Sequence, residues 1–408
     1  MYSRVYPLSV IRRPSFLFLV LIFFVTLHCY RQFTNNQNYF AAPWARHISR
    51  EAADVSRETS SPDIYSTFSQ GVPKPPGSNY SRALVIPRLQ REDVSWIAAE
   101  LKDVEEFVYV VDDPSAPLHP PLNKGHEAMV YLTYLIDHYD NFPDIMIFMH
   151  SHGISWHNEE ALAFKSAELI NRLSNERVTR DGYMNLRCNW GPGCPDWLHP
   201  RKKEADPGKQ EEVILAKSWT ELFPTVEVPA VLSQACCAQF ALSGERARAI
   251  PKSKYVFYRD WILRTELSDY ISGRVWEYLW HVVFTGQNVF CPEQHVCYCD
   301  GYGLCFGGAK GMDEYFGLVY QKRDQVRALD KWRKMAKAIE DAEKEGKPPE
   351  EIEKMERPEP GKDKVMDREI EEKKQRLGKM VEIAKEKGKD PRIRAEEAGR
   401  PWKEGDGF

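Results

Sequence analysis

The chain has 408 residues, which is enough for one large domain or two ordinary ones with additional segments. Its composition is close to that of an average globular protein, and its formal net charge at pH 7 is −4. This balance lacks the basic excess of nucleic-acid-binding proteins, so no nucleic-acid partner is expected.

The amino-terminal segment predicts membrane targeting. Three arginines within residues 1–13 precede an apolar run over residues 16–27, the pattern of a secretory signal or a signal anchor. No pair of small residues marks a cleavage site behind the run, which favours an uncleaved anchor over residues 14–30 with residues 1–13 in the cytosol. We therefore expect a single-pass type II membrane protein of the ER or Golgi whose remainder is lumenal. Secretion after signal cleavage is the alternative.

Residues 31–80 are polar and rich in Ser, Pro and Asn, which predicts a stem linker. The sequon Asn79-Tyr80-Ser81 at its end suits a lumenal glycoprotein. Of the nine cysteines, Cys29 belongs to the anchor. The other eight are an even number behind a targeting segment, which predicts disulfides.

The spacing of these cysteines does not determine their pairing. Cys188 and Cys194 are near enough in sequence to close a short loop. A zinc site is the alternative for the carboxyl-terminal cysteines, although their spacing lacks the paired CxxC of zinc ribbons. The four are Cys291, Cys297, Cys299 and Cys305.

The pattern from residue 81 to 312 predicts one globular domain. Apolar runs at 83–86, 107–111 and 145–149 read as strands, and apolar periodicity between them reads as helices that Asp93 and Asn123 can cap. Alternating strands and helices predict an α/β fold with a mostly parallel sheet and crossover helices.

The second half of the domain predicts mainly helices and loops. Helices are expected at 159–173, 211–222 and 255–265, after Ser243, and from Ser272 to 283; a strand is expected at 226–232 and loops at 181–207 and 290–311. Residues 313–408 are dominated by charges with narrow apolar stripes, which predicts solvated helices with flexible breaks. This tail is either a partly disordered segment or a surface for a protein partner.

Three histidines follow the apolar run at 145–149 within eight positions: His150, His152 and His157. Because side chains alternate along a strand, His150 and His152 are expected on one face. Neutral imidazole is a common ligand of Zn²⁺ or Mn²⁺, so the cluster predicts a divalent metal site beyond the carboxyl end of a strand. The alternative is that the imidazoles hydrogen-bond within their loop.

Two further groups of residues are candidates. Asp112 and Asp113 end the second strand, where carboxylates can accept hydrogen bonds from a ribose or hold a metal, although Asp-Asp-Pro is also an ordinary strand terminator. Glu277 and His281 are four residues apart in an expected helix and would share one face, with Arg274 one turn earlier. A carboxylate beside an imidazole can act as a general base; an exposed charged pair is the alternative.

Several motifs in order resemble a family found in fungi and bacteria and named only as a domain of unknown function. They lie within residues 82–310, and the resemblance implies no established activity. The motifs are Arg88–Ile97, Leu122–Glu127, Tyr139–Asp144, the histidine stretch, Ala238–Phe240 with Arg246, and Gly273–His281.

The layout also resembles, more remotely, glycosyltransferases of the A-type, nucleotide-diphospho-sugar fold. Those enzymes begin with a strand and an E-x-x-x-W/L helix, as Glu92–Trp96 matches, and their second strand often ends in an Asp pair. The resemblance implies a donor site with Arg88, Glu92, Asp112 and Asp113. Where the family holds its metal with Asp-x-Asp, this chain has His150-Ser151-His152, which puts the usual Mn²⁺ site in doubt.

The resulting hypothesis is a membrane-anchored, lumenal glycosyltransferase-like enzyme. It would transfer a sugar from a nucleotide sugar to a glycan or small-molecule hydroxyl acceptor, with His150 and His152 binding a metal or the diphosphate and Glu277 as base. One alternative is a metal-dependent hydrolase in which His150, His152 and His157 activate water. Another is a non-catalytic lumenal protein that binds partners through its tail.

Overall fold

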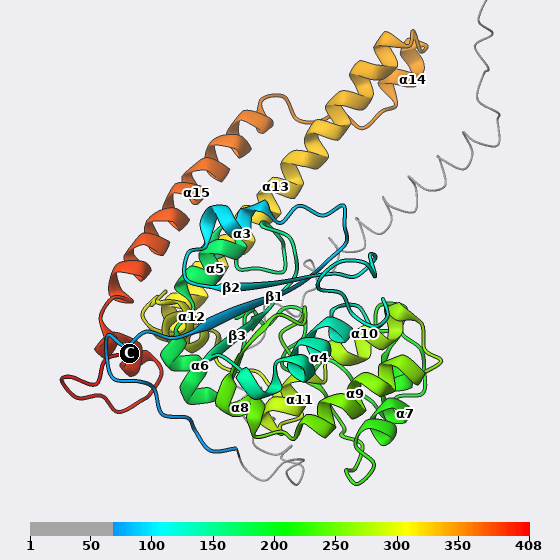
Figure 1. The fold of residues 1–408 in the computed structure, drawn as a ribbon. Coiled ribbons are helices and arrows are strands. Elements are labelled where there is room, and N and C mark those ends of the chain that lie inside the picture. Colours follow the sequence, from blue (N-terminus) through cyan, green and yellow to red (C-terminus); the bar gives the residue numbers. More distant parts are fainter. Residues whose placement is uncertain (1–67) are drawn as a thin grey trace, which may run out of the picture. The chain divides into compact units, whose positions relative to one another are not determined.

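A five-stranded sheet with the order β2-β1-β3-β6-β4 forms the centre of the protein (Figure 1). The computed structural model describes residues 68–408, which all belong to one unit. Strand β1 is parallel to β2 and β3, whereas β6 is antiparallel to β3 and β4. The strands are β1 (Arg82–Arg88), β2 (Glu105–Val110), β3 (Ile145–Phe148), β4 (Tyr183–Asn185) and β6 (Phe240–Ser243); β5 (Ser233–Gln234) and β7 (Val289–Phe290) form a separate parallel pair.

Helices cover both faces of this sheet because its central strands are apolar on both sides. In Figure 1, α3 and α5 lie on one face, and α4, α9, α10 and α11 lie on the other. The domain helices are α3 (Ser95–Glu100), α4 (Glu127–Asp137), α5 (Ser166–Arg172), α6 (Asn175–Asp181), α7 (Glu212–Leu222), α8 (Gly244–Arg248), α9 (Lys252–Arg264), α10 (Asp269–Glu277), α11 (Trp280–Thr285) and α12 (Gln294–Tyr302). Two short 3₁₀ turns are η3 (Tyr139–Asn141) and η4 (Glu160–Leu162).

The alternation of side chains along β3 separates two cores. Ile145 and Ile147 join the cluster that includes Trp96 of α3 and residues of α5. Phe148 points to the opposite face, where Tyr131 of α4 packs against it with ring centroids 5.0 Å apart. Phe148 is the last residue of β3, so the regular alternation of side chains ends there.

The predicted strands at 83–86, 107–111 and 145–149 are confirmed, and so is the α/β class. The sheet is mixed, because β6 is antiparallel to both of its neighbours. Ser243 caps α8 as predicted, because its side chain accepts a hydrogen bond from the backbone N–H of Arg246. The helix predicted to start near Asn123 begins later, at Glu127.

Several predicted boundaries are wrong. The helix predicted over 159–173 is interrupted because Ala163 and Phe164 have positive φ values of 54° and 59°, which no α-helix accommodates. The segments predicted as loops contain β4 and α12, and the strand predicted over 226–232 is replaced by β5. Antiparallel β6, too short for a clear period, was not predicted.

The predicted disulfides are present, but the pairing of Cys188 with Cys194 is wrong. The four cysteines of the zinc alternative all take part in disulfides, so they are not free thiolates. The pairs are Cys188–Cys297, Cys194–Cys291, Cys236–Cys237 and Cys299–Cys305. Cys29 and the expected anchor over residues 14–30 lie outside the described residues.

The charged segment after the domain is helical, as predicted. It contains α13 (Gly308–Lys344), α14 (Pro349–Glu353), α15 (Lys362–Lys387) and α16 (Pro391–Glu397), and α13 packs against α15 as an antiparallel hairpin (Figure 1). Glu160 accepts hydrogen bonds from Lys322 and Arg323 of α13, each at 2.6 Å. Between residues 68 and 408, no helix has both the length and the apolar character needed to cross a membrane.

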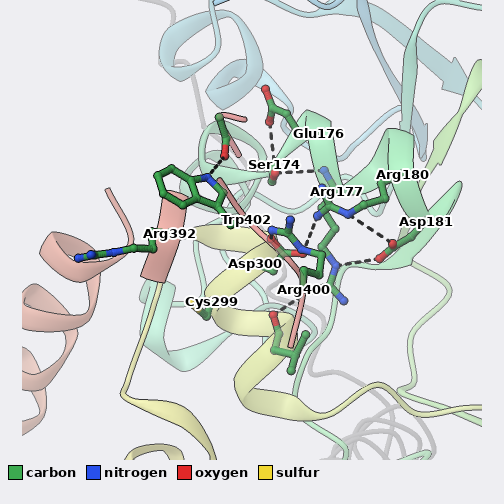
Figure 2. Close-up of polar contacts among 12 residues, drawn as sticks. Ser174, Glu176, Arg177, Arg180, Asp181, Cys299, Asp300, Arg392, Arg400 and Trp402 are labelled. Carbon is green, nitrogen blue, oxygen red and sulfur yellow. Dashed lines mark hydrogen bonds and ion pairs between the residues drawn. The ribbon is translucent and has the colours of Figure 1, made fainter. Parts of the chain in front are cut away.

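A buried carboxylate fastens the end of the chain to the domain. Figure 2 shows Arg180 and Arg400 turned toward Asp300 of α12. One oxygen of Asp300 lies 2.7 Å from Arg180 Nη2 and the other lies 2.7 Å from Arg400 Nη2. Burial opposes ionisation of Asp300, but Arg177, Arg180 and Arg400 outweigh it and hold its pKa below the ordinary value.

Candidate functional site

The candidate site lies where the carboxyl ends of β1 and β3 diverge. The chain leaves β1 for β2 on one side and returns to β3 on the other side of β1. The order of the parallel strands therefore reverses between β1 and β3, which is where open α/β sheets bind their ligands. The loops that follow Arg88 and Phe148 carry most of the residues predicted from the sequence.

Glu92 joins these two loops. Its Oε2 atom accepts hydrogen bonds from the backbone N–H of Leu89 at 2.8 Å and from the Ser151 hydroxyl at 3.0 Å. Its Oε1 atom lies 3.8 Å from Nε2 of His152, whose side chain is 61% exposed. Arg88 donates to the carbonyl oxygen of Glu92 at 2.9 Å. Glu92 and Arg88 thus shape the loop after β1 and leave the His152 imidazole open to a ligand.

His150 and His157 form a close pair of imidazoles. Their Nδ1 atoms are 2.8 Å apart. Burial lowers the pKa of His150 to about 4 and that of His157 to about 2, and repulsion from His152 and from His150, respectively, adds to the effect. Both rings are therefore neutral near pH 7, and one Nδ1 atom donates its hydrogen to the other.

The expectation that His150 and His152 share one face is wrong. Strand β3 ends at Phe148, so the two-residue alternation does not extend through the turn that follows. His150 faces Glu127, with 3.9 Å between Nε2 and Oε2, whereas His152 faces Glu92.

Glu127 is a part of the site that the sequence reasoning missed. It is the first residue of α4, which the chain enters through the positive φ values of Gly125 (77°) and His126 (50°). Burial raises the pKa of Glu127 to about 8, and the charge of Glu277 adds to this effect. Glu127 therefore carries a proton at neutral pH, although the amino end of a helix favours an anion.

Glu277, the last residue of α10, is the second buried carboxyl group of the site. Burial raises its pKa, while the charge of Arg274 and a hydrogen bond from the backbone N–H of Cys237 oppose the rise. That hydrogen bond is 2.7 Å long at Glu277 Oε1. Because α4 and α10 pack together, the charge of one carboxyl group raises the pKa of the other. Glu127 is the protonated member of the pair.

The loop between β5 and β6 connects the carboxyl group of Glu277 to the imidazole pair. Cys236 and Cys237, neighbours in sequence, are joined by a disulfide, and Cys237 and Ala238 have positive φ values of 90° and 48°. The next residue, Gln239, is buried and accepts a hydrogen bond from the backbone N–H of His150 at 3.2 Å. Residues 237–239 therefore contact both halves of the site.

The structure separates His281 from Glu277. The expected helix is divided, because Ser268 caps α10, α10 ends at Glu277, and α11 begins at Trp280. The i,i+4 pairing is therefore wrong. His281 is fully buried, with Nε2 2.9 Å from the carbonyl oxygen of Asn288, and burial lowers its pKa to about 4.

The two aspartates after β2 differ in their freedom to bind a ligand. The Asp113 carboxylate accepts hydrogen bonds from the hydroxyl and the backbone N–H of Ser115 at 2.6 and 2.9 Å, and these bonds lower its pKa. Asp113 thus closes the turn. Asp112 is exposed and uses one oxygen to accept a hydrogen bond from the N–H of Gln90 at 2.8 Å. Of the two, Asp112 is the more open to a ligand.

The donor set matches a divalent metal only in part. Metal sites gather three or more protein ligands on one point. Within residues 68–408, three potential ligand atoms lie within 4.8 Å of one another in two groups, Cys236-Cys237-Glu277 and Cys299-Cys305-Glu397, and the sulfurs of both are in disulfides. The histidines do not form such a group, because only His150 and His157 face each other.

Two buried charged residues lie behind the histidines. Arg187 donates to the carbonyl oxygens of Trp156 and His157 at 2.9 and 3.1 Å. Glu159 accepts hydrogen bonds from the backbone N–H of Cys188 and from the hydroxyl of Tyr298. Glu159 directly follows the histidine stretch, which was a usable signal, whereas no local pattern distinguishes Arg187. Together they fix the loop that carries His157.

Comparison with known proteins supports the predicted family. No curated protein and no solved structure matches the chain. Residues 84–300 match the family described as "Protein of unknown function (DUF3431)", and this stretch covers more than half of the 408 residues and nearly all residues of the candidate site. The chain therefore belongs to the DUF3431 family, as the resemblance to a domain of unknown function predicted.

Proposed function

We propose that this protein is a glycosyltransferase that transfers a sugar from a nucleotide sugar to a hydroxyl group of an acceptor. The observation that carries the proposal is a buried pair of carboxyl groups, Glu127 and Glu277, beside two neutral imidazoles at the switch point between β1 and β3. Groups with perturbed pKa values gather at sites that move protons. A switch point beyond parallel strands suits a nucleotide.

In the proposed reaction, Glu277 is the general base. Its carboxylate accepts the proton of the acceptor hydroxyl while the hydroxyl oxygen forms a bond to the anomeric carbon of the donor. The bond from that carbon to the diphosphate oxygen breaks, and its electron pair stays on the leaving group. The backbone N–H of Cys237 and the nearby charge of Arg274 favour the ionised form of Glu277 that this step requires.

Glu127 and the imidazole pair provide neutral hydrogen-bonding groups beside the base. Protonated Glu127 adds no negative charge beside the base, and it can donate a hydrogen bond to the substrate. His150 and His157 are neutral and hold each other through Nδ1, so the Nε2 atom of His150 points its lone pair or hydrogen toward Glu127. A preorganised polar site of this kind stabilises charge that develops in the transition state.

The donor would lie along the loops after β1 and β2. Exposed Asp112 is suited to accept hydrogen bonds from a ribose, and exposed His152 is suited to contact the diphosphate. Arg88 and Glu92 support these loops and would position the donor through them. The two-imidazole arrangement gives no particular support to the metal-dependent hydrolase.

We also propose a lumenal location with an anchor over residues 14–30. Four disulfides and the exposed sequon residue Asn79 support an oxidising, secretory compartment. The helical hairpin of α13 and α15, with its exposed charged faces, is the candidate surface for a protein partner.

The test combines binding with turnover. The full-length protein is screened against UDP-, GDP- and CMP-sugars, with and without Mn²⁺ or Zn²⁺, by thermal shift and by release of the nucleotide diphosphate or monophosphate. Binding to the native state alone raises the melting temperature. We expect Glu277→Gln to keep the shift and to lose turnover by a factor of 10² or more, roughly the contribution of a general base.

Glu168→Gln is the control, because Glu168 is half exposed and pairs with Arg172 on the same helix, α5, outside the candidate site. It should retain both the shift and the turnover. If no nucleotide sugar changes the melting temperature, or if Glu277→Gln turns over at the rate of the control, the proposed activity is wrong.

A further inference from the structure

Exposed aromatic side chains are rare in this protein, and two of them flank the candidate site. Among the described residues, only Trp156, Tyr270 and Phe408 are aromatic and more than a third exposed, at 41%, 47% and 38%. Two of these rings, Trp156 and Tyr270, lie beside residues of the candidate site, because Trp156 packs on His157 and Tyr270 packs on His126, the neighbour of Glu127. Such exposure points to a ligand.

A row of short contacts leads from one of these rings to the other. The Trp156 ring packs on His157 with centroids 4.2 Å apart, and His157 packs on His150 at 4.7 Å. His150 faces Glu127, and the neighbouring His126 packs against Tyr270 at 6.0 Å. Glu127 and the imidazole pair are therefore members of the row of residues that connects the two exposed rings.

Each exposed ring is held from behind by an anchored arginine. The guanidinium of Arg187 lies 5.6 Å from the Trp156 ring centroid, and the same residue donates to the carbonyl oxygen of Trp156. The guanidinium of Arg274 lies 5.7 Å from the Tyr270 ring centroid, and Glu211, fully buried, fixes it through two hydrogen bonds of 2.7 and 2.8 Å. Both rings are exposed and yet preorganised, which lowers the entropy cost of binding on them.

We propose that Trp156 and Tyr270 are the acceptor subsites and that the acceptor is an oligosaccharide, an inference that rests on the proposed function. A pyranose has an apolar face of C–H groups, which stacks on a flat aromatic ring, and a rim of hydroxyl groups. Two rings separated by hydrogen-bonding carboxyl and imidazole groups match a chain of at least two sugar units. Its reacting hydroxyl lies between the rings, over Glu277.

The chemistry of the surface distinguishes this occupant from a protein partner. A protein interface presents a contiguous apolar core with charges at its rim. Here the order is inverted, because the buried carboxyl groups and the imidazoles lie in the middle and the rings lie at the two ends.

The test measures oligosaccharide binding without any donor. The full-length protein is applied to a glycan array of neutral chains of two to ten units, and the best binder is titrated by calorimetry. We expect Trp156→Ala and Tyr270→Ala each to weaken its Kd about tenfold or more, and Trp156→Phe to recover most of the loss. Phe408→Ala is the matched control, because Phe408 is an exposed ring on an arginine, 4.5 Å from Arg394, outside the site.

The outcomes separate this inference from the proposed function. If nucleotide sugars bind but no glycan does, or if Phe408→Ala weakens glycan binding as much as Trp156→Ala, the acceptor subsites are wrong and the transferase proposal stands. If the wild type binds a protein or peptide at this surface in place of any glycan, the inference is overturned in favour of a partner. If neither nucleotide sugars nor glycans bind, both proposals fail.

Discussion

The Nδ1 atoms of His150 and His157 lie 2.8 Å apart, so the two imidazoles share a single hydrogen between them. Two imidazolium ions could not approach in this way, because both nitrogen atoms would then carry a hydrogen. The contact therefore requires that at least one ring stays neutral. It explains in geometric terms why the folded chain resists protonation at this place.

The free energy of unfolding should fall on mild acidification because of this pair. The pKa of each histidine is lowered in the folded state, to about 4 for His150 and about 2 for His157, from the ordinary value of 6.5. Below pH 6.5 the unfolded chain therefore binds protons that the native state does not bind. For each histidine, the free energy of unfolding falls by about 1.4 kcal/mol for every pH unit of acidification. Urea unfolding at pH 7, 6 and 5 measures this slope.

Replacing both histidines with Gln should reduce the slope between pH 6.5 and 5 to the part that His281 contributes, whatever it does to stability at pH 7. His295→Gln, a change on α12 outside the pair, is the control and should keep the wild-type slope. An equal slope in the double variant and the wild type would show that the pair does not titrate as described.

Glu127 should make the free energy of unfolding fall as the pH rises from 4.5 to about 8. Its pKa is raised in the folded state to about 8 from the ordinary 4.5, so between these values the native state holds a proton that the unfolded chain has released. The stability that this proton represents is fully present below pH 4.5 and is lost as the pH rises toward 8. Glu127→Gln mimics the protonated form, and we expect it to stabilise the protein by about 2 kcal/mol at pH 7.5.

The same substitution should leave most of the turnover, because in the proposed reaction Glu127 donates a hydrogen bond without transferring a proton and the Gln amide can donate in its place. The measurement is urea unfolding of the wild type and of Glu127→Gln at pH 5 and pH 7.5. A gain at pH 7.5 that disappears at pH 5 supports the raised pKa. A uniform loss of stability at both values would contradict it.

The disulfides should divide into stabilising and positioning bonds. Cys188–Cys297 closes a stretch of 109 residues, and in the chain-entropy account a loop of about 100 residues contributes about 4.7 kcal/mol. Cys236–Cys237 joins neighbours, so the same account gives it only about 1 kcal/mol. Double Ala substitution at 188 and 297 should therefore lower the melting temperature markedly.

Double Ala substitution of Cys236 and Cys237 should instead act on the reaction. The loop that they close donates a hydrogen bond to Glu277, so we expect kcat to fall while the nucleotide-sugar Kd changes little. Calorimetry and steady-state kinetics on the two double variants make the comparison. A large loss of stability without a change in kcat would assign this bond a structural role only.

Asp300 should be among the most sensitive positions outside the site. Asp300→Asn leaves Arg180 and Arg400 without their buried counter-charge, and breaking a buried ion pair costs about 3–5 kcal/mol. Arg333→Ala removes an exposed pair with Asp367, whose side chains are more than half exposed, and should cost less than about 1 kcal/mol. Urea unfolding, and the rate at which trypsin cleaves after Arg392 and Arg394, report the two effects.

Much of the parallel core was predictable from the sequence because its strands are continuous apolar runs. Residues 83–86 and 145–149 are buried on both faces, so their hydrophobicity alone marks them. Strand β6 could not be recognised in this way, because its four residues, Phe240–Ser243, are too few to show a period. Its partners, β3 and β4, are distant in sequence.

The site was predictable in its residue types but not in its pairings. The histidine stretch stands out locally, and Glu277 belongs to a recognisable motif. The contact of His150 with Glu127, however, depends on how α4 packs against the sheet, a property of the assembled domain. The predicted pairing of Glu277 with His281 was wrong because α10 ends at Glu277 and α11 begins at Trp280. The residues between the two helices include no Gly or Pro that would have indicated the break.

The two ends of the charged hairpin meet at one place. The backbone N–H of Cys305 donates to the carbonyl oxygen of Ala384 at 3.0 Å, and Gly388 approaches Gly303 so closely that a side chain on Gly388 would overlap its backbone. Residues 306–383 therefore form a long insertion whose two ends lie next to each other on the domain. Doubling the length of such a loop costs only about 0.6 kcal/mol of closure entropy, so natural relatives should tolerate hairpins of very different length. The exposed turn at Gly346 is, for the same reason, a place where a reporter domain can be inserted without disturbing the candidate site.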